Sequence, residues 1–450
     1  MTHATDPALP VSTENGSLLR QDARTRRRNA AETRFKLYGV IAISIGLLML
    51  VTLVTTIVSN GSGAFRQSFV TLDVELLESK LDKTGDRDLE QIKKVSTFGY
   101  APLINGAFET LAAEQGVETA LSAKEMGEIL SKDAAAQLRD YVLANPDRIG
   151  TTAEFTFLAN SRVDGYMKGR VSRDSIQNDK NISVEQLDFV DQLVNLGLIE
   201  KKFNPAFILG ADASDQRPEA AGFGVSMIGS LFMMLVVLVL SLPIGVAASI
   251  YLEEFAPKTW WTDVIEVNIS NLAAVPSIVF GILGLAVFIN TMHLPMSAPL
   301  VGGMVLTLMT LPTIIISTRA ALKAVPPSIR DAALGIGASR MQSVFHHVLP
   351  LAAPGILTGT IIGLAQALGE TAPLLLIGMV GFVASNAPDG IVAGLLDPNS
   401  AMPAQIYEWA KRADPAFYER AWGGIIILLV FLVAMNTIAV ILRRRFERRW

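Results

Sequence analysis

Residues 330–350 read RDAALGIGASRMQSVFHHVLP, and they lie between two long apolar runs, Pro299–Thr318 and Leu351–Val383. Basic residues lie in or just before this segment, at Arg319, Lys323, Arg330 and Arg340. Membrane proteins concentrate Lys and Arg in short cytoplasmic loops, so the pattern predicts a cytoplasmic loop between two membrane spans. Residues 321–350 therefore indicate a multi-pass membrane protein.

The composition agrees with this interpretation. The chain has 450 residues, of which 50% are hydrophobic and 18% charged. This exceeds the apolar content that a soluble domain needs for its core. The net charge of −4 is small, so we expect no nucleic-acid partner. The chain has no cysteine and only four histidines, and we predict no metal and no cofactor.

A bilayer core about 30 Å thick is crossed by roughly 20 apolar helical residues. Six runs reach that length, which predicts six transmembrane helices: Leu37–Val58, Phe223–Tyr251, Val264–Asn290, Pro299–Thr318, Leu351–Val383 and Trp422–Leu442. The first run is longer than a signal-peptide core and lacks a small-residue cleavage site, so we interpret it as an anchor helix.

Charge at both ends predicts the orientation in a bacterial inner membrane. Seven basic residues precede the first run, at Arg20, Arg24, Arg26, Arg27, Arg28, Arg34 and Lys36. The last run continues into Arg443-Arg444-Arg445. Both termini are therefore expected in the cytoplasm, and an even number of crossings agrees with that.

These boundaries divide the chain into a basic tail at 1–36, the first helix at 37–58, a soluble segment at 59–217, a transmembrane domain at 218–442 and a second basic tail at 443–450. The soluble segment is predicted to be an extracytoplasmic mixed α/β domain with helices in the majority. Amphipathic patterns indicate helices at Ala123–Leu143 and Val184–Leu198, while Ile149–Thr152 and Phe155–Leu158 favour strands.

The loop carries a specific spacing. Asp331-Ala332-Ala333 is followed after three positions by Gly337, then by His347 and Leu349-Pro350. This pattern resembles the cytoplasmic coupling loop of ABC importer permeases, with Asp331 in place of the usual glutamate and His347 in place of the usual isoleucine. The resemblance implies a short helix that docks on an ATPase subunit, with small alanines against the partner and a turn at Gly337. Leu349-Pro350 is expected to start the next membrane helix. An interfacial helix without a partner is the alternative.

Four further segments extend the resemblance over about Gly222–Leu442: LPIGVAASIYLEEFAP at 242–257, NLAAVPSIV at 271–279, GETAPLL at 369–375 and MPAQIY at 402–407. They resemble PstA-type permease subunits of bacterial high-affinity phosphate importers, in the extended form with an N-terminal extracytoplasmic domain. The fold implied is an all-α polytopic membrane protein, the type I ABC importer permease fold, with an inserted soluble domain.

Glu370 is the main candidate for the substrate pathway, together with Gln366 and Thr371. It lies about 16 residues past Pro354, roughly 24 Å along a continuous helix, where a charge must face protein or water. A carboxylate can accept hydrogen bonds from a protonated phosphate. An interhelical hydrogen bond near Pro373 is the structural alternative, and Gln366, where relatives carry an arginine, is as well explained by packing.

Other charged residues are interpreted structurally. Arg319 is expected to be an interface anchor, Glu253 and Glu254 to cap an interfacial helix, and His346 and His347 to be solvated loop residues. The chain has no Gly-x-x-x-x-Gly-Lys-Ser/Thr segment, so we expect no ATPase activity of its own.

The resemblance implies four kinds of partner besides membrane lipid: a homologous PstC-like permease, two PstB-like ATP-binding subunits and an extracytoplasmic PstS-like phosphate-binding protein. The function implied is phosphate import driven by ATP. A permease for sulfate or molybdate, and a membrane sensor with an extracytoplasmic ligand domain, remain alternatives.

Overall fold

The computed structural model describes residues 23–82, 85–174, 176, 179, 181–379, 388 and 390–446. The chain divides into two compact units, Met1–Thr56 and Ile57–Trp450. Parts of three sequence predictions lie outside the described residues: the tail before residue 23, the end of the fifth apolar run after residue 379, and the tail after residue 446.

The first helix, α1, spans Ala23–Gly61 and so begins well before the apolar run at Leu37. Its basic first half is stabilised by an ion pair between Lys36 and Glu32, four residues apart at 2.7 Å. Only 6% of its most apolar window is buried within the chain. A long helix with exposed apolar side chains is what a lipid-facing span requires.

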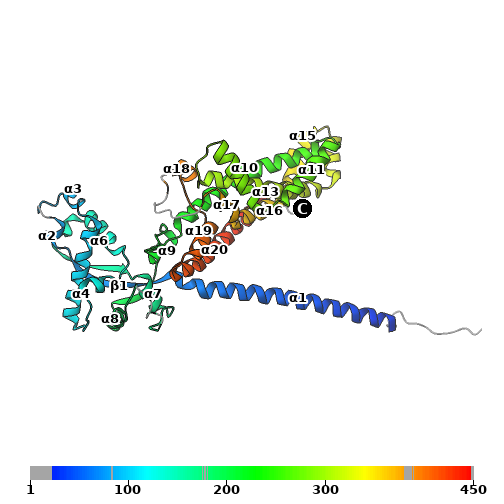
Figure 1. Cartoon of the computed structure of the whole chain (residues 1–450). Coiled ribbons are helices and arrows are strands. Elements are labelled where there is room, and N and C mark those ends of the chain that lie inside the picture. The colour runs from blue at the N-terminus through cyan, green and yellow to red at the C-terminus, as the bar shows by residue number, and fades with distance from the viewer. Residues whose placement is uncertain are drawn as a thin grey trace, which may run out of the picture. The chain divides into compact units, whose positions relative to one another are not determined.

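The inserted domain, residues 62–220, is built on a three-stranded antiparallel sheet of order β2-β1-β3. The strands are β1 (Arg66–Glu75), β2 (Thr152–Leu158) and β3 (Ile199–Phe203). Alternate residues of β1, Val70, Leu72 and Val74, are buried in the domain core. Helices α4 and α7 pack against β1, and α8 packs against β3 (Figure 1).

The helices of this domain are α2 (Glu78–Leu81), α3 (Leu89–Ile92), α4 (Ala101–Gln115), α5 (Ala123–Gly127), α6 (Ala134–Ala144), α7 (Ser161–Met167), α8 (Val184–Asn195) and α9 (Ala206–Leu209), with 3₁₀ turns at Ser62–Phe65, Thr97–Gly99, Pro146–Arg148 and Pro218–Ala220. The predicted mixed α/β character is confirmed. The predicted helix at Ala123–Leu143 is divided into α5 and α6, and of the strand predicted at Ile149–Thr152 only Thr152 belongs to a strand.

A buried polar junction joins the inserted domain to the last helix, α20 (Pro415–Phe446). Arg420 of α20 donates to the backbone carbonyls of Pro218, Glu219 and Ala221 at 2.6, 2.6 and 2.8 Å. Glu419, next to it, accepts from Lys168 at 3.2 Å and from Arg170 at 2.6 Å. Because buried charges are costly unless paired, these contacts hold the domain against the start of α20.

The remaining elements are α10 (Gly224–Ile250) with a π-helical turn at Tyr251–Phe255, α11 (Trp260–Ala273), α12 (Ser277–Gly284) with a π-helical segment at Leu285–Thr291, α13 (Pro299–Lys323), α14 (Pro327–Gly335), α15 (Arg340–Ser343) with a π-helical turn at Val344–Val348, α16 (Leu349–Gly369), α17 (Ala372–Leu376), α18 (Gly390–Leu396), α19 (Met402–Lys411) and α20. Within the described ranges, five helices are long and apolar enough to cross a membrane, or six if one bent pair counts as a span.

That bent pair corrects the third predicted span. The run Val264–Asn290 is not one helix, because α11 and the helical stretch Ser277–Thr291 meet at 100°. Pro276 lies at the bend with ψ of 135°. Proline cannot donate to the preceding turn and disfavours helix in the residue before it, so the chain turns here.

The fifth span also differs from its prediction. Helical structure runs without interruption from Arg340 to Gly369, so Leu349-Pro350 lies inside a helix rather than at its start. A π-helical turn at Val344–Val348 comes directly before Pro350. The wider turn accommodates a proline that cannot donate to the carbonyl four residues earlier. His346 and His347 are therefore helical residues, although both are exposed.

Close helix packing is achieved with glycine. A Cβ on Gly303 of α13 would lie 2.5 Å from Cβ of Val236 on α10, and one on Gly245 of α10 would lie 2.7 Å from a side-chain carbon of Ile314. Small residues at these positions let the helix backbones approach, as in other membrane helix pairs. The α10–α13 pair is thereby the centre of the helical domain.

Candidate functional sites

The first candidate site is the break between α16 and α17. Gly369 is the last residue of α16, and Glu370 follows with an extended backbone at φ −77° and ψ 132°. α17 begins at Ala372, with Pro373 in its first turn, a position that proline favours. Glu370 thus follows the last residue of α16, and the helix is continuous from Pro354 to Gly369, in agreement with the helical count from Pro354.

The carboxylate of Glu370 has no hydrogen bond or ion pair to any described residue, and its side chain is half-buried. The predicted interhelical hydrogen bond therefore has no partner among the residues that the structure describes. Gln366, one turn earlier in α16, is exposed, and Thr371 is half-buried. All three lie around one helix end.

The segment after Glu370 is held by close backbone contacts. A Cβ on Gly281 of α12 would lie 2.6 Å from Cα of Pro373, so α12 and α17 touch. Beyond α17, the hydroxyl of Ser297 donates to the carbonyl of Gly378 at 2.6 Å. Gly378 has a φ of +85°, which glycine adopts at little cost. The position of Glu370 therefore depends on α12.

The second candidate site is the loop that contains α14. The helix ends at Gly335, and Gly337 follows with a φ of +92°. The amide of Gly337 donates to the carbonyl of Leu334 at 3.0 Å, and that of Ala338 donates to the carbonyl of Ala333 at 3.0 Å. These two bonds form a Schellman motif, which requires a left-handed residue at Gly337. The predicted turn at Gly337 has this physical basis.

The outer face of this loop is exposed and partly apolar. Asp331 and Ala332 are exposed, whereas Ala333 is buried at 4% exposure. Nearby apolar side chains are also exposed: Leu334, Ile336, Met341 and Phe345. Large exposed apolar residues in one short loop are typical of an interaction site, and this loop also contains the exposed Asp331.

The inner face of the loop is charged and paired. Arg330 donates to both carboxylate oxygens of Glu254, with 2.6 Å between Nη2 and Oε1. Arg319 pairs with Glu266 at 2.5 Å and with Glu253 at 3.4 Å. Glu253 and Glu254 were expected to cap a helix, but the structure gives them ion-pair partners in α13 and α14. The interface role of Arg319 stays a prediction. The charge signs were visible in the sequence, but the pairing was not.

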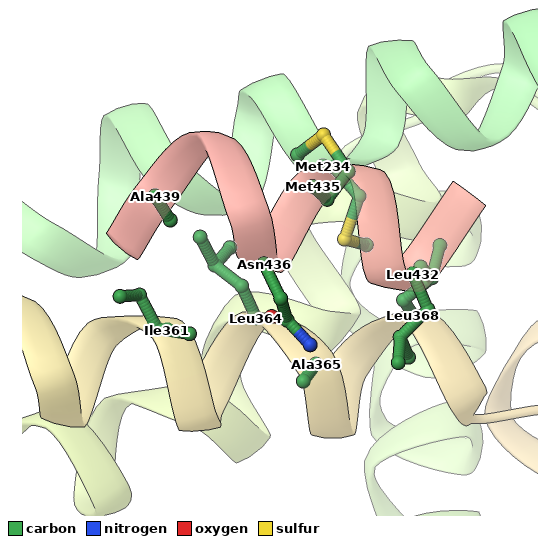
Figure 2. A pocket seen from close by; sticks show the side chains of 9 residues that line it. All are labelled: Met234, Ile361, Leu364, Ala365, Leu368, Leu432, Met435, Asn436 and Ala439. Carbon is green, nitrogen blue, oxygen red and sulfur yellow. The ribbon is translucent and has the colours of Figure 1, made fainter. Parts of the chain in front are cut away.

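A small cavity lies between α10, α16 and α20 (Figure 2). Its volume is about 40 Å³, and Asn436 is the one polar side chain in a lining otherwise formed by Met234, Ile361, Leu364, Ala365, Leu368, Leu432, Met435 and Ala439. The volume is large enough for a water molecule, but the single polar side chain offers fewer hydrogen-bond partners than a buried water requires. Without a cationic or further polar side chain, the cavity does not suit an anion.

A larger groove of about 470 Å³ is lined only by apolar residues, namely Leu242, Pro243, Val246, Ala247, Ile250, Phe345, Leu349, Ala353, Ile356 and Leu357. It offers no hydrogen-bond donor to a charged substrate. Among the described residues, no group of three or more His, Asp or Glu side chains is placed to hold a metal ion. Neither cavity is therefore a binding site for an anion or a metal.

Two family models match the chain. One, described as a domain of unknown function (DUF3333), covers residues 22–177. The other, described as the inner membrane component of binding-protein-dependent transport systems, covers residues 241–450. The first match includes α1 and most of the inserted domain, and the second lies within the helical domain.

The helical part is similar to proteins of known assignment. It is 30% identical over 235 residues to the phosphate transport system permease protein PstA of Mycobacterium leprae, which covers 52% of this chain and 74% of that protein. It is also 30% identical over 225 residues to the PstA protein of Yersinia pestis, covering 49% of this chain and 73% of that protein. Among solved structures, an inward-facing MetNI methionine ABC transporter matches with 15% identity and a TM-score of 0.38, over 50% of this chain and 95% of that one.

Proposed function

Since the chain belongs to the PstA family of phosphate transport system permease proteins, we propose that it is a membrane-spanning subunit of an ATP-driven importer of inorganic phosphate. The observation that carries this proposal is the 30% identity to a PstA protein over 74% of that protein's length. The family model of binding-protein-dependent transport components, which matches residues 241–450, includes both the α14 loop and the Glu370 break. The chain is a membrane subunit, and we assign ATP hydrolysis to a partner.

The proposed assembly contains this chain, a homologous PstC-like permease, two PstB-like ATP-binding subunits and a PstS-like phosphate-binding protein. It would lie in the bacterial inner membrane with both termini in the cytoplasm and residues 59–217 outside. ATP binding would close the motor, push the α14 loop and open the spans toward the loaded binding protein.

We assign docking of the ATPase to the loop at 321–350. Asp331, Ala332, Ala333 and Gly337 are its main residues. The exposed apolar side chains of this loop support this assignment, because an unpartnered apolar loop in water is unfavourable and a protein partner would cover it. Buried Ala333 and the Schellman turn at Gly337 would hold α14 in a fixed shape for the partner.

We assign the substrate pathway to Glu370, Gln366 and Thr371. The unpaired, half-buried Glu370 carboxylate can accept a hydrogen bond from a protonated phosphate, and Gln366 can donate its amide to a phosphate oxygen. The two apolar cavities of this chain do not suit an anion. A cationic contact to phosphate would therefore come from the partner permease across the break after α16.

Uptake of radiolabelled phosphate tests the proposal. Cells that lack this chain should regain phosphate uptake when the wild-type chain is expressed with its partner subunits. An excess of unlabelled phosphate should abolish the uptake of label, whereas the same excess of sulfate or molybdate should leave that uptake unchanged. No restoration of phosphate uptake, or competition by sulfate or molybdate as strong as by phosphate, would show that the substrate is wrong.

A further inference from the structure

We propose that five charged side chains act as positioning residues that transmit movement of α14 to α10 and α11. They are Arg330, Glu254, Glu253, Arg319 and Glu266, and we call them the charge bridge. This inference rests on the proposed role of the α14 loop in docking the motor. It adds the route by which a push on that loop reaches the spans.

Arg330 is the first link. It lies in α14 directly before the exposed Asp331, yet its guanidinium points inward to Glu254 in the π-helical turn after α10. The same guanidinium donates to the carbonyl of Val325 at 2.8 Å and to that of Leu322 at 2.9 Å. One side chain therefore ties α14, the end of α13 and the end of α10 together.

Glu253 and Arg319 are the next links. Glu253, adjacent to Glu254, accepts from Arg319 of α13 at 3.4 Å and lies 3.5 Å from Lys323. The other end of the Arg319 guanidinium contacts Glu266 of α11 at 2.5 Å. Positive and negative groups thus connect α14 to α11 through two adjacent glutamates.

Four of the five side chains are more enclosed than those of ordinary surface ion pairs, whereas Glu266, the end of the bridge on α11, is 37% exposed. The side chain of Glu254 is 10% exposed and that of Arg330 is 22% exposed. Arg319 is 15% exposed and Glu253 is 18% exposed. A half-exposed pair can separate into water at little cost, but an enclosed pair that separates leaves charges without solvent. The elements it joins are therefore held in fixed relation when α14 is displaced.

The route continues to the candidate pathway. α11 is followed at the 100° bend by α12, and α12 touches α17 where Gly281 meets Pro373. α17 begins two residues after Glu370. A shift of α14 would thus be transmitted through the charge bridge to α11 and α12 and change the position of Glu370. The motor itself would not contact the pathway.

Double-mutant analysis in the reconstituted complex tests the bridge. The whole importer, with binding protein and ATPase, is placed in proteoliposomes, and phosphate taken up per ATP hydrolysed is measured for Arg330→Gln, Glu254→Gln and the double variant. Each single variant should keep the ATPase bound but lower this ratio roughly tenfold, a typical size for coupling between sites. The double variant should be no worse than Arg330→Gln, because that variant already removes the contact with Glu254. The charge-exchanged pair R330E with E254R should recover part of the ratio.

Arg444→Gln is the matched control, since Arg444 is an exposed arginine of α20 without an ion pair in the described chain. It should leave the ratio unchanged. Arg330→Lys keeps the charge but cannot form two parallel bonds, so its ratio should lie between those of the wild type and Arg330→Gln. This variant replaces Arg330→Gln in the test if Arg330→Gln does not assemble. The proposal would be overturned by an unchanged ratio of phosphate to ATP in Arg330→Gln or Arg330→Lys. Strictly additive losses in the double variant, or release of the ATPase from a single variant, would overturn it as well. A failure of the wild-type chain to transport phosphate would instead count against the proposed function.

Discussion

Replacement of Arg420 by methionine should loosen the junction between the inserted domain and α20. Three hydrogen bonds from the guanidinium to the carbonyls of Pro218, Glu219 and Ala221 would be lost. The Glu219 carbonyl keeps a bond from Gln67 at 2.9 Å, and that of Pro218 keeps a longer one from the amide of Ala221 at 3.3 Å. We therefore use the low value of about 1 kcal/mol for each lost bond, or about 3 kcal/mol in all. Methionine refills the apolar volume and avoids a cavity.

Amide hydrogen exchange of the purified full-length protein measures this loss. The amides of Gly222, Phe223 and Gly224 directly follow Ala221, whose carbonyl accepts from Arg420, and they donate to the carbonyls of residues 211, 207 and 210 at the end of the inserted domain. A loss of about 3 kcal/mol should raise their exchange rates roughly 100-fold, while amides of β1 keep theirs. Arg148→Met, at an exposed arginine of the inserted domain, is the control. Unchanged exchange at the junction would refute the reasoning, as would equal acceleration in β1, which would indicate global unfolding.

Four further outcomes are expected. Asp331→Lys should reduce co-purification of the ATPase, whereas Asp331→Glu should not; normal recovery with lysine would remove Asp331 from the docking surface. Glu370→Gln should impair phosphate uptake at least about tenfold with the complex intact, and unaltered uptake would leave the residue a structural role only. Gly337→Ala should strain the Schellman turn by about 1 kcal/mol, visible as roughly fivefold faster exchange of the Ala338 amide. Burial raises the pKa of the Glu219 carboxyl, so the folded state binds its proton more tightly and stability falls as pH rises between the unfolded-state pKa and the raised folded-state pKa. Thermal unfolding of Glu219→Gln should show a shallower decline over that window, and an identical pH profile would contradict the assignment.

Local sequence patterns were sufficient for much of the fold. Apolar runs of span length identified α1, α10, α13, α16 and α20, because a helix in lipid needs its side chains apolar whatever it contacts. The glycine at 337 was recognised as a turn, since its backbone geometry depends only on its neighbours. The spacing from Asp331 to Pro350 identified the loop, because such a spacing likewise depends only on residues that are close in the sequence.

Proline effects were predicted less well, because the outcome depends on what surrounds the residue. Pro350 looked like a helix start but lies inside a helix after a π-helical turn. Pro276 looked tolerable within a span but marks a 100° bend. Proline thus lies inside a helix in one case and at a bend in the other, and tertiary packing selects the result.

The inserted domain shows a similar limit. β2 and α8 have strong local patterns and were predicted, whereas the central strand β1 was missed although its alternate residues are buried. A strand is stable only through partners that lie far along the chain, here β2 and β3. Its local signal is correspondingly weak.

The sequence by itself determined that this is a multi-pass membrane protein with a loop of the ABC permease type, because bilayer thickness and loop spacing act on contiguous residues. Only the tertiary structure decided which charges meet. Glu254 and Arg330 are 76 positions apart, and Glu266 and Arg319 are 53 apart. Ion pairing depends on distance in space, and no local pattern encodes it. The loop from Arg330 to Pro350 was therefore recognisable in the sequence, whereas its connection to the spans was not.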